Sequence, residues 1–294
     1  MPPPSGIVRT IRAAIAANDF RGAERLLHKY RDDNGVTPEA LEALSWLARG
    51  SFAAHRFAKA TNYARRAHRL LVQGLENADL DSELSLASAL GASIEVLAQL
   101  KARQGRHSDA VRFLKKELGE YGMTSIGTRI RKNLNLLTIE GQAAPALEAR
   151  EWLGPRPPAL SKLHGRPVLV FFWAHYCADS RAQCRALVRI REKFGSSELV
   201  LIGPTRRYGY LDEHRRKPAA RRQEMQHIQR VLDQYYSSLP GLPIPISERN
   251  FDIYGVSTTP TLVLIDRSGV VALYHPGKIS YGDLARKIRS LLLT

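Results

Sequence analysis

One residue of this chain is best suited to covalent chemistry, and a second marks a loop that would lie beside it. Cys177 follows an apolar run from Val168 to Ala174, and a helical pattern begins directly after it. A cysteine at a helix N-terminus faces the positive end of the helix dipole and free backbone N–H groups, which stabilise a thiolate. Pro260 stands directly before a second apolar run, where proline removes a hydrogen-bond donor from the sheet. A cis Thr259–Pro260 bond in a loop that faces Cys177 would explain that position.

The sequence around these residues resembles the TlpA-like thiol–disulfide oxidoreductases of the thioredoxin superfamily. The resemblance covers about residues 139–294, and it is carried by EGQAAPALEAREWLG, the Trp-Ala-x-x-Cys signature, the Thr-Thr-Pro-Thr step and LIDRSGVV. It implies a thioredoxin-like α/β sandwich. It also implies that Cys177 is the reactive thiol, that Pro260 is a cis-proline beside it, and that Trp173 packs beneath it.

The chain departs from that family where the second, resolving cysteine would stand. The family pattern is Cys-x-x-Cys, whereas this chain has Ser180 at the fourth position. A hydroxyl does not usefully attack a mixed disulfide, because exchange needs a thiolate. Phe171 stands where many thioredoxins keep a buried carboxylate that accepts a proton from the resolving thiol. The two losses are consistent with a site that works with one cysteine.

Cys184 is the only other thiol of the chain. Seven residues of helix place it about 10.5 Å along the axis from Cys177, whereas a disulfide needs Cα atoms within about 7 Å. We therefore expect Cys184 to be a small buried core residue, because bridging would require the first helical turns to unwind. Two cysteines also exclude a disulfide-stapled scaffold and a four-cysteine zinc site. We expect no metal and no cofactor.

Other side chains could modulate the thiol. His175 could hold a thiolate as a cation, although we favour an exposed polar residue in the loop. Asp179 places a negative charge in the first helical turn, which works weakly against a thiolate. The long connection at residues 203–223 could flank the site. Its Tyr208 and Tyr210, with nearby arginines, could contact a partner there.

Apolar runs alternate with helical patterns through the second half of the chain. The expected strands are Val168–Trp173, Leu199–Ile202, Leu262–Ile265 and Val270–Tyr274, and the expected helices are Ser180–Phe194, Arg221–Tyr236 and Tyr281–Leu292. Strands alternating with helices, then a closing hairpin and a terminal helix, predict a mixed α/β sandwich.

The first 135 or so residues predict helices joined by short breaks. Segments that begin at Phe20, Phe57 and His107 each place small residues at helical spacing after a bulky ring. NDFRGAERLLHKY and, more faintly, GRHSDAVRFLKKEL resemble the second helix of a tetratricopeptide repeat, although the spacings of 37 and 50 residues exceed the usual length of about 34. A plain helical bundle for dimerisation or spacing is the alternative to a peptide-binding solenoid. The predicted domains are 1–137, all-α and tetratricopeptide-like, and 138–294, thioredoxin-like.

The chain is basic, with 44 Lys and Arg against 28 Asp and Glu. Much of the excess in the second half comes from Arg206, Arg207, Arg215, Arg216, Lys217, Arg221 and Arg222. Such a run could bind nucleic acid or an anionic membrane face. No nucleic-acid-binding motif accompanies it, so we favour a solvated basic surface. The longest apolar run has seven residues, too few for a membrane-spanning helix, which needs about 18.

These features predict a thiol–disulfide exchange protein with a degenerate Cys-x-x-Ser site, which forms mixed disulfides with protein or low-molecular-weight thiols. The helical domain could hold a further protein partner. The alternative, which Ser180 favours, is a redox-inactive thioredoxin fold that serves as a protein-binding or chaperone module. The N-terminus as given has no secretory signal. Proteins that it resembles usually act outside the bacterial cytoplasm, so we expect a periplasmic or exported protein, with the cytoplasm as the alternative.

Overall fold

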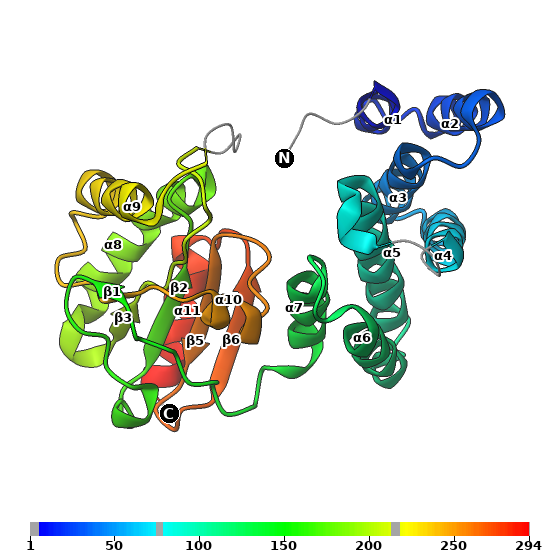
Figure 1. Ribbon diagram of the computed structural model, residues 1–294. Helices are drawn as coiled ribbons and strands as arrows, with labels where there is room; N and C mark the ends of the chain where they lie inside the picture. The colour runs from blue at the N-terminus through cyan, green and yellow to red at the C-terminus, as the bar shows by residue number, and fades with distance from the viewer. Residues whose placement is uncertain (1–5, 75–78, 213–217, 294) are drawn as a thin grey trace. The chain divides into compact units, whose positions relative to one another are not determined.

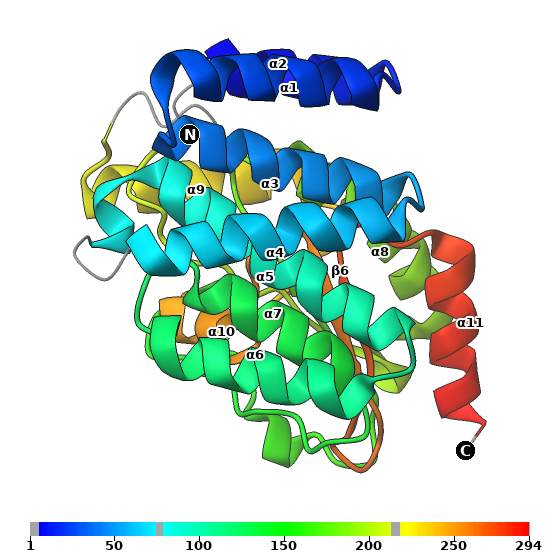
Figure 2. The ribbon, with the colours of Figure 1, turned by 90° about the vertical axis from the view of Figure 1, so that its right-hand side faces the viewer.

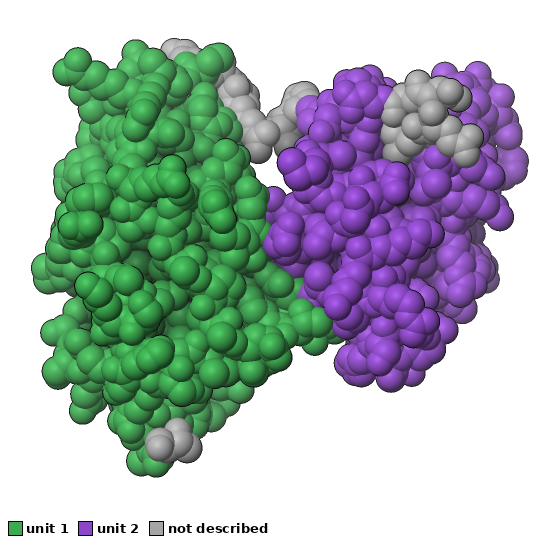
Figure 3. All heavy atoms as spheres, turned by 60° about the horizontal axis from the view of Figure 1, so that its bottom comes forward, with its two compact units in different colours: residues 1, 135–294 green, residues 2–134 purple. Residues whose placement is uncertain are grey.

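The computed structural model describes residues 6–74, 79–212 and 218–293. The chain forms two compact units, which we call the helical unit (residues 2–134) and the α/β unit (residues 135–294) (Figures 1 and 3). The division falls within helix α7, Gly127–Thr138, three residues before the start of the predicted second domain.

The described part of the helical unit contains helices and no strand, as the sequence predicts. Each helix packs against the next, and α1, α3 and α5 also pack against one another in succession. Figure 2 shows α3, α4, α5 and α6 side by side. The helices are α1 (Gly6–Ala16), α2 (Phe20–Asn34), α3 (Pro38–Ala53), α4 (Phe57–Gly74), α5 (Leu84–Arg103) and α6 (His107–Tyr121), with a 3₁₀ turn at Leu80–Ser82.

The three related segments of the sequence begin α2, α4 and α6. The residue two positions before each start has a left-handed backbone: Asn18 (φ 59°), His55 (φ 57°) and Gly105 (φ 76°). The backbone N–H of the next residue donates each time to the carbonyl five positions earlier, in the preceding helix. The pairs are Asp19 to Ala14, Arg56 to Ser51 and Arg106 to Lys101. The small residues Ala23, Ala60 and Ala110 are fully buried. The unit therefore repeats one helix–turn–helix geometry.

The α/β unit is built on a four-stranded sheet of order β3-β2-β5-β6. Strand β2 (Val168–Phe172) pairs in parallel with β3 (Val200–Ile202) and antiparallel with β5 (Thr261–Ile265), which pairs antiparallel with β6 (Val271–Pro276). These strands match the predicted ones to within two residues at each end. A pair of two-residue strands, β1 (Trp152–Leu153) and β4 (Ile244–Pro245), has no counterpart in the prediction.

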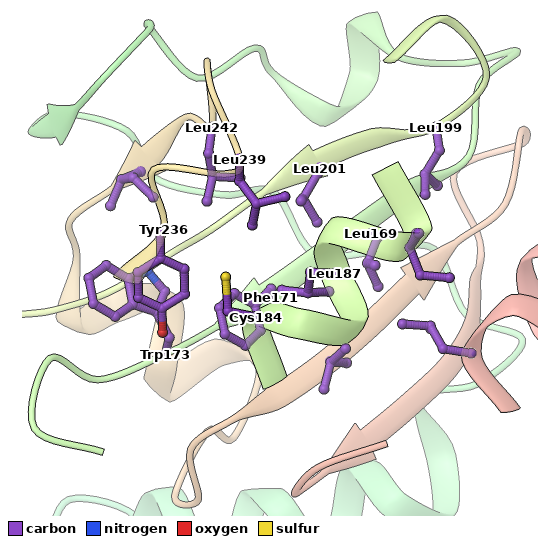
Figure 4. Packing of buried hydrophobic residues seen from close by; sticks show 14 of the residues in the cluster. Leu169, Phe171, Trp173, Cys184, Leu187, Leu199, Leu201, Tyr236, Leu239 and Leu242 are labelled. Carbon is purple, nitrogen blue, oxygen red and sulfur yellow. The ribbon is translucent and has the colours of Figure 1, made fainter. Parts of the chain in front are cut away.

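Both faces of this sheet are covered. Leu169 and Phe171 point to the face packed by α8 (Ala178–Glu198), α9 (Arg221–Tyr235) and α11 (Tyr281–Leu292) (Figure 4). Val168, Val170 and Phe172 point to the other face, with α10 (Glu248–Ile253) and Ile139. Burial on both faces explains why β2 is an unbroken apolar run. The fold is an all-helical N-terminal region followed by a thioredoxin-like α/β domain. None of the described helices is long and apolar enough to span a membrane.

Candidate functional site

Cys177 lies between the end of β2 and the start of α8, where it is the N-cap residue of the helix. Its Sγ accepts a hydrogen bond from the backbone N–H of Ser180 at 3.4 Å, and as a thiol it donates to the carbonyl oxygen of Thr259 at 3.1 Å. The side chain is partly exposed. The Thr259–Pro260 bond is cis, as predicted. The fold thus brings Cys177, Ser180 and the Pro260 loop together at the end of the sheet where β2 stops and β5 begins.

Ser180, for which the family resemblance implies the position of a resolving thiol, is completely buried. Its Oγ has no hydrogen-bond partner within the described parts of the chain. The contact between this residue and the sulfur of Cys177 is made by the Ser180 backbone N–H. The site therefore holds one sulfur and a buried hydroxyl where an ordinary thioredoxin site has two sulfurs.

Cys184 lies in the core on the inner side of α8, as the helix geometry predicts. It packs in the cluster that contains Phe171 and Leu187 (Figure 4), and its Sγ donates to the carbonyl of Tyr235 at 3.1 Å. Burial raises the pKa of this thiol. Cys184 is therefore a poor nucleophile, because the thiolate is the reactive form.

The charge of Asp179 is balanced by a residue that the sequence analysis did not single out. Lys278 lies 2.7 Å from the Asp179 carboxylate, so the acidic side chain in the first turn of α8 does not stand alone beside the sulfur. The neighbouring Ile279 is fixed to α8 by two hydrogen bonds, because the Gln183 amide donates to its carbonyl and accepts from its N–H. These contacts hold the loop after β6 against the helix that carries Cys177.

His175 differs from both roles that its sequence position suggested. The side chain is 1% exposed, and Nε2 donates to the carbonyl of Tyr210 at 2.9 Å. A carbonyl only accepts, so the proton of the neutral ring is on Nε2. Burial lowers the pKa of His175 to about 4. The expectation of an exposed loop residue is wrong, and a neutral imidazole does not hold the thiolate as a cation.

The loop after β3 is the reason for this burial. The rings of Tyr208, Tyr210 and His227 lie 5.5, 6.2 and 5.2 Å from the His175 ring, and Tyr176 joins the same cluster. The Glu224 carboxylate accepts the N–H groups of Tyr208 and Gly209 and so fixes the loop. The loop does flank the site. The two tyrosines pack in an aromatic cluster, in which Tyr210 is buried and Tyr208 stays partly exposed. Contact of these residues with a partner stays a prediction.

Part of the basic stretch is neutralised by acidic residues. Arg206 pairs with Glu248 at 3.1 Å, and Arg207 and Arg221 pair with Glu151 at 2.7 and 3.0 Å. Arg215, Arg216 and Lys217 lie outside the described residues. Nowhere in the described chain do three or more His, Cys, Asp or Glu side chains gather to hold a metal ion. The chemistry that the arrangement offers is that of a single accessible thiol.

Known proteins are similar in sequence to parts of this chain. No family model matches the chain. It is 24% identical over 151 residues to the thioredoxin-like protein YneN of Bacillus subtilis, which covers 51% of this chain and 78% of that protein. It is 27% identical over 120 residues to human nucleoredoxin, covering 38% of this chain and 23% of nucleoredoxin.

Two solved structures are similar to about half of the chain. A putative thiol:disulfide interchange protein DsbE from Chlorobium tepidum has a TM-score of 0.41 and 22% identity over 52% of this chain and 97% of that one. A thiol-disulfide isomerase from Corynebacterium glutamicum has a TM-score of 0.41 and 20% identity over 51% of this chain and 97% of that one. The strand order, the helices on both faces and the similarity to YneN together make the C-terminal half of this chain a thioredoxin-like domain.

Proposed function

We propose that the protein is a thiol–disulfide exchange protein that works through Cys177 alone. The position of its sulfur at the start of α8 carries this proposal. There the sulfur accepts the Ser180 N–H at the N-terminus of a helix, which is a common setting for a reactive cysteine, and the side chain is partly exposed. Cys184, with its raised pKa and buried sulfur, does not compete for the role.

In the proposed step, the Cys177 thiolate attacks one sulfur of a partner disulfide. A new S–S bond joins Cys177 to that sulfur as the old S–S bond breaks, and the second partner sulfur leaves as a thiolate that takes a proton from water. Ser180 cannot release the adduct, because exchange needs a thiolate. A thiol of a second protein or of a small molecule then attacks the mixed disulfide and regenerates Cys177.

The experiment that tests this mechanism compares the wild type with Ser180→Cys and Cys184→Ala. The wild type is expected to accumulate mixed disulfides and to reduce insulin-like disulfides slowly unless an external thiol is supplied. Ser180→Cys restores a thiol that competes intramolecularly, so adduct lifetime is expected to fall by about a hundredfold or more. Mass spectrometry of quenched adducts gives the lifetimes.

Two results would contradict the proposal. Strong wild-type reductase activity that disappears in Cys184→Ala would replace the single-thiol mechanism with one that uses both cysteines. No exchange in either the wild type or Ser180→Cys would favour the alternative function, a redox-inactive module that binds or retains proteins. The buried, unpartnered hydroxyl of Ser180 is the observation that supports that alternative.

We also propose that the helical unit is a tetratricopeptide-like array that binds a protein partner, and that the protein acts in the periplasm or outside the cell. The repeated turn before α2, α4 and α6 supports the first proposal. Cross-linking from exposed positions on these helices in cells tests it, and recovery of no cross-linked protein would contradict it. Fractionation of cells that express the full-length protein tests the second proposal.

A further inference from the structure

We propose that an open groove between α8 and α9 binds an acidic segment of the disulfide partner, close in sequence to the cysteine that Cys177 attacks. This inference rests on the proposed function and names its substrate class. The two helices lie on the same face of the sheet (Figure 1). The groove has a volume of about 610 Å³, and nine residues of α8, α9 and the turn after α9 line it.

Three of the nine lining residues are arginines, and none is acidic. Arg181, Arg185 and Arg189 are spaced four residues apart, so they share one face of α8. Arg181 lies one helical turn after Cys177, since its N–H bonds the Cys177 carbonyl. The row of arginines therefore begins one helical turn after the reactive cysteine and leads away from it along α8.

Two of these guanidinium groups are held in place by aromatic rings. Arg181 lies over Tyr235 at 5.2 Å and donates to the His175 carbonyl at 3.2 Å, and Arg189 lies over Tyr281 at 3.7 Å. A stacked guanidinium keeps its N–H donors available at the edge of its plane. Such a donor set is suited to a carboxylate, which it can bind through two parallel hydrogen bonds.

The described residues supply no carboxylate to this row. None of the three arginines forms an ion pair within the described chain; the nearby Asp179 pairs with Lys278, and Asp233 accepts from Gln229. Glu192 is exposed on α8, but it does not line the groove. The α/β unit therefore leaves three cations beside its reactive thiol for a partner to neutralise.

The length of the row decides between a small thiol and a peptide. Twelve residues of helix separate Cys177 from Arg189, which is about 18 Å. An extended chain spans at most about 3.6 Å per residue, so five or six residues are needed to join the sulfur to the far arginine. A thiol of tripeptide size reaches only about 11 Å. We therefore assign the groove to a protein segment with acidic residues within about six positions of its cysteine.

The test uses peptides that carry one cysteine as a mixed disulfide with 2-thiopyridine. Acidic residues stand before or after the cysteine in two peptides, and glutamine or lysine replaces them in the others. Cys177 is expected to react with one of the two acidic peptides about tenfold faster than with its glutamine counterpart at low salt, and added salt should reduce the difference. Absorbance of the released thiopyridone gives the rates.

Variants distinguish binding in the groove from attraction by the positive charge of the unit as a whole. Arg185→Gln with Arg189→Gln should bring the acidic and glutamine peptides to within about twofold of each other, whereas lysine at both positions should retain most of the preference. The matched control is Arg222→Gln with Arg249→Gln, which removes the same charge from exposed sites of the same unit and should leave the preference unchanged. Equal rates for acidic and neutral peptides in the wild type, or equal loss in both double variants, would overturn the proposal.

Two further measurements keep this inference distinct from the proposed function. The rate with the uncharged 2,2′-dithiodipyridine reports on the thiol and the fold of each variant, and each peptide rate is divided by it. The control double variant, Arg222→Gln with Arg249→Gln, should react with it at the wild-type rate. If the wild type fails to react with it, the proposed function fails. Fluorescence anisotropy with peptides that carry serine in place of cysteine then tests the groove independently. Binding of the acidic peptide to the wild type, and its loss in Arg185→Gln with Arg189→Gln, would support the groove. Equal binding of all peptides would contradict it.

Discussion

At the scale of single residues, the two cysteines differ in their exposure and in their position on α8. Cys177 is partly exposed at a helix N-terminus, whereas Cys184 is buried and its pKa is raised. Thiolate fraction and access set the alkylation rate. We expect iodoacetamide at neutral pH to modify Cys177 at least about tenfold faster than Cys184. Peptide mass spectrometry over a time course measures both rates.

Cys184→Ala provides the control for that prediction. It should leave the alkylation rate of Cys177 unchanged, because the smaller side chain stays within the core. Equal rates at the two cysteines, or faster modification of Cys184, would show that the nucleophile has been assigned to the wrong residue.

The buried imidazole of His175 makes stability depend on pH. Its pKa is about 4 in the fold, against 6.5 for an unburied histidine, so the unfolded chain binds the extra proton between these values. The stabilisation is therefore complete above about pH 6.5 and is lost as the pH falls towards 4, by about 3 kcal/mol in total. Urea unfolding of the wild type and His175→Phe at pH 7 and pH 4.5 tests this.

The variant should be less stable at pH 7, because the hydrogen bond to Tyr210 is lost, but it should lose less stability on acidification. His227 packs against His175, and burial lowers its pKa too, so only the difference between the two proteins reports on His175. Parallel pH profiles for the wild type and the variant would contradict the assignment of a neutral, buried ring.

At the scale of elements, the central strands could be predicted because burial on both faces gives unbroken apolar runs. Strands β1 and β4 could not, because two residues are too few to show a period. The burial of His175 was also out of reach. It depends on Tyr208 and Tyr210, which are more than thirty residues away and lie in a loop whose polar sequence does not reveal its packing.

The recurring turn of the helical unit could not be predicted from the sequence either. The left-handed position before each second helix is filled by Asn18, His55 and Gly105, so no single residue type marks it. Glycine adopts this backbone freely, and asparagine and histidine adopt it more often than most other residues. The spacing also differs, because a longer connection separates α4 from α5 than α2 from α3. The sequence therefore shows a degenerate repeat where the structure has one recurring turn.

A partly buried ion-pair network joins two helices, α5 and α7. Glu95 of α5 lies 2.7 Å from Arg129 and 2.9 Å from Lys132, both on α7, and these cations lower the pKa of Glu95 to about 2. Glu95→Gln would leave two partly buried cations without their carboxylate. We expect the free energy of unfolding to fall by about 3 kcal/mol. Urea denaturation of the full chain measures the change.

Glu120→Gln is the matched control, because Glu120 is an exposed residue of the same unit, and it should change stability by less than about 0.5 kcal/mol. The lowered pKa of Glu95 also determines how its contribution to stability depends on pH. Its contribution is complete above about pH 4.5 and is lost as the pH falls towards 2. Equal effects of the two substitutions would mean that the network contributes nothing to stability.

At the scale of the whole molecule, the sequence placed the change of domain near Thr138, where helical spacing gives way to Pro- and Gly-rich sequence. The Asn135 contact places the start of the α/β unit earlier, within α7, and the two residues after α7 also belong to its core. The Asn135 amide donates to the Tyr254 carbonyl, Ile139 is 7% exposed within the core of the sheet, and the Glu140 carboxylate accepts the Tyr274 N–H. These three residues belong to the thioredoxin-like core, although Asn135 precedes the segment that carries the family resemblance.

This arrangement predicts how the α/β unit responds to shortening. A fragment of residues 135–294 retains these three contacts. A fragment of residues 142–294 loses one buried isoleucine and three hydrogen bonds to the rest of the unit, because the Gly141 N–H also donates to the Val271 carbonyl. Burying an isoleucine contributes about 2 kcal/mol, and each hydrogen bond contributes about 1 kcal/mol. We therefore expect the shorter fragment to be about 5 kcal/mol less stable in urea unfolding. Ile139→Ala in the longer fragment should reproduce about half or more of that loss, because it removes the apolar contact alone. Equal stability of the two fragments would place the start of the unit after residue 142 and remove α7 from its core.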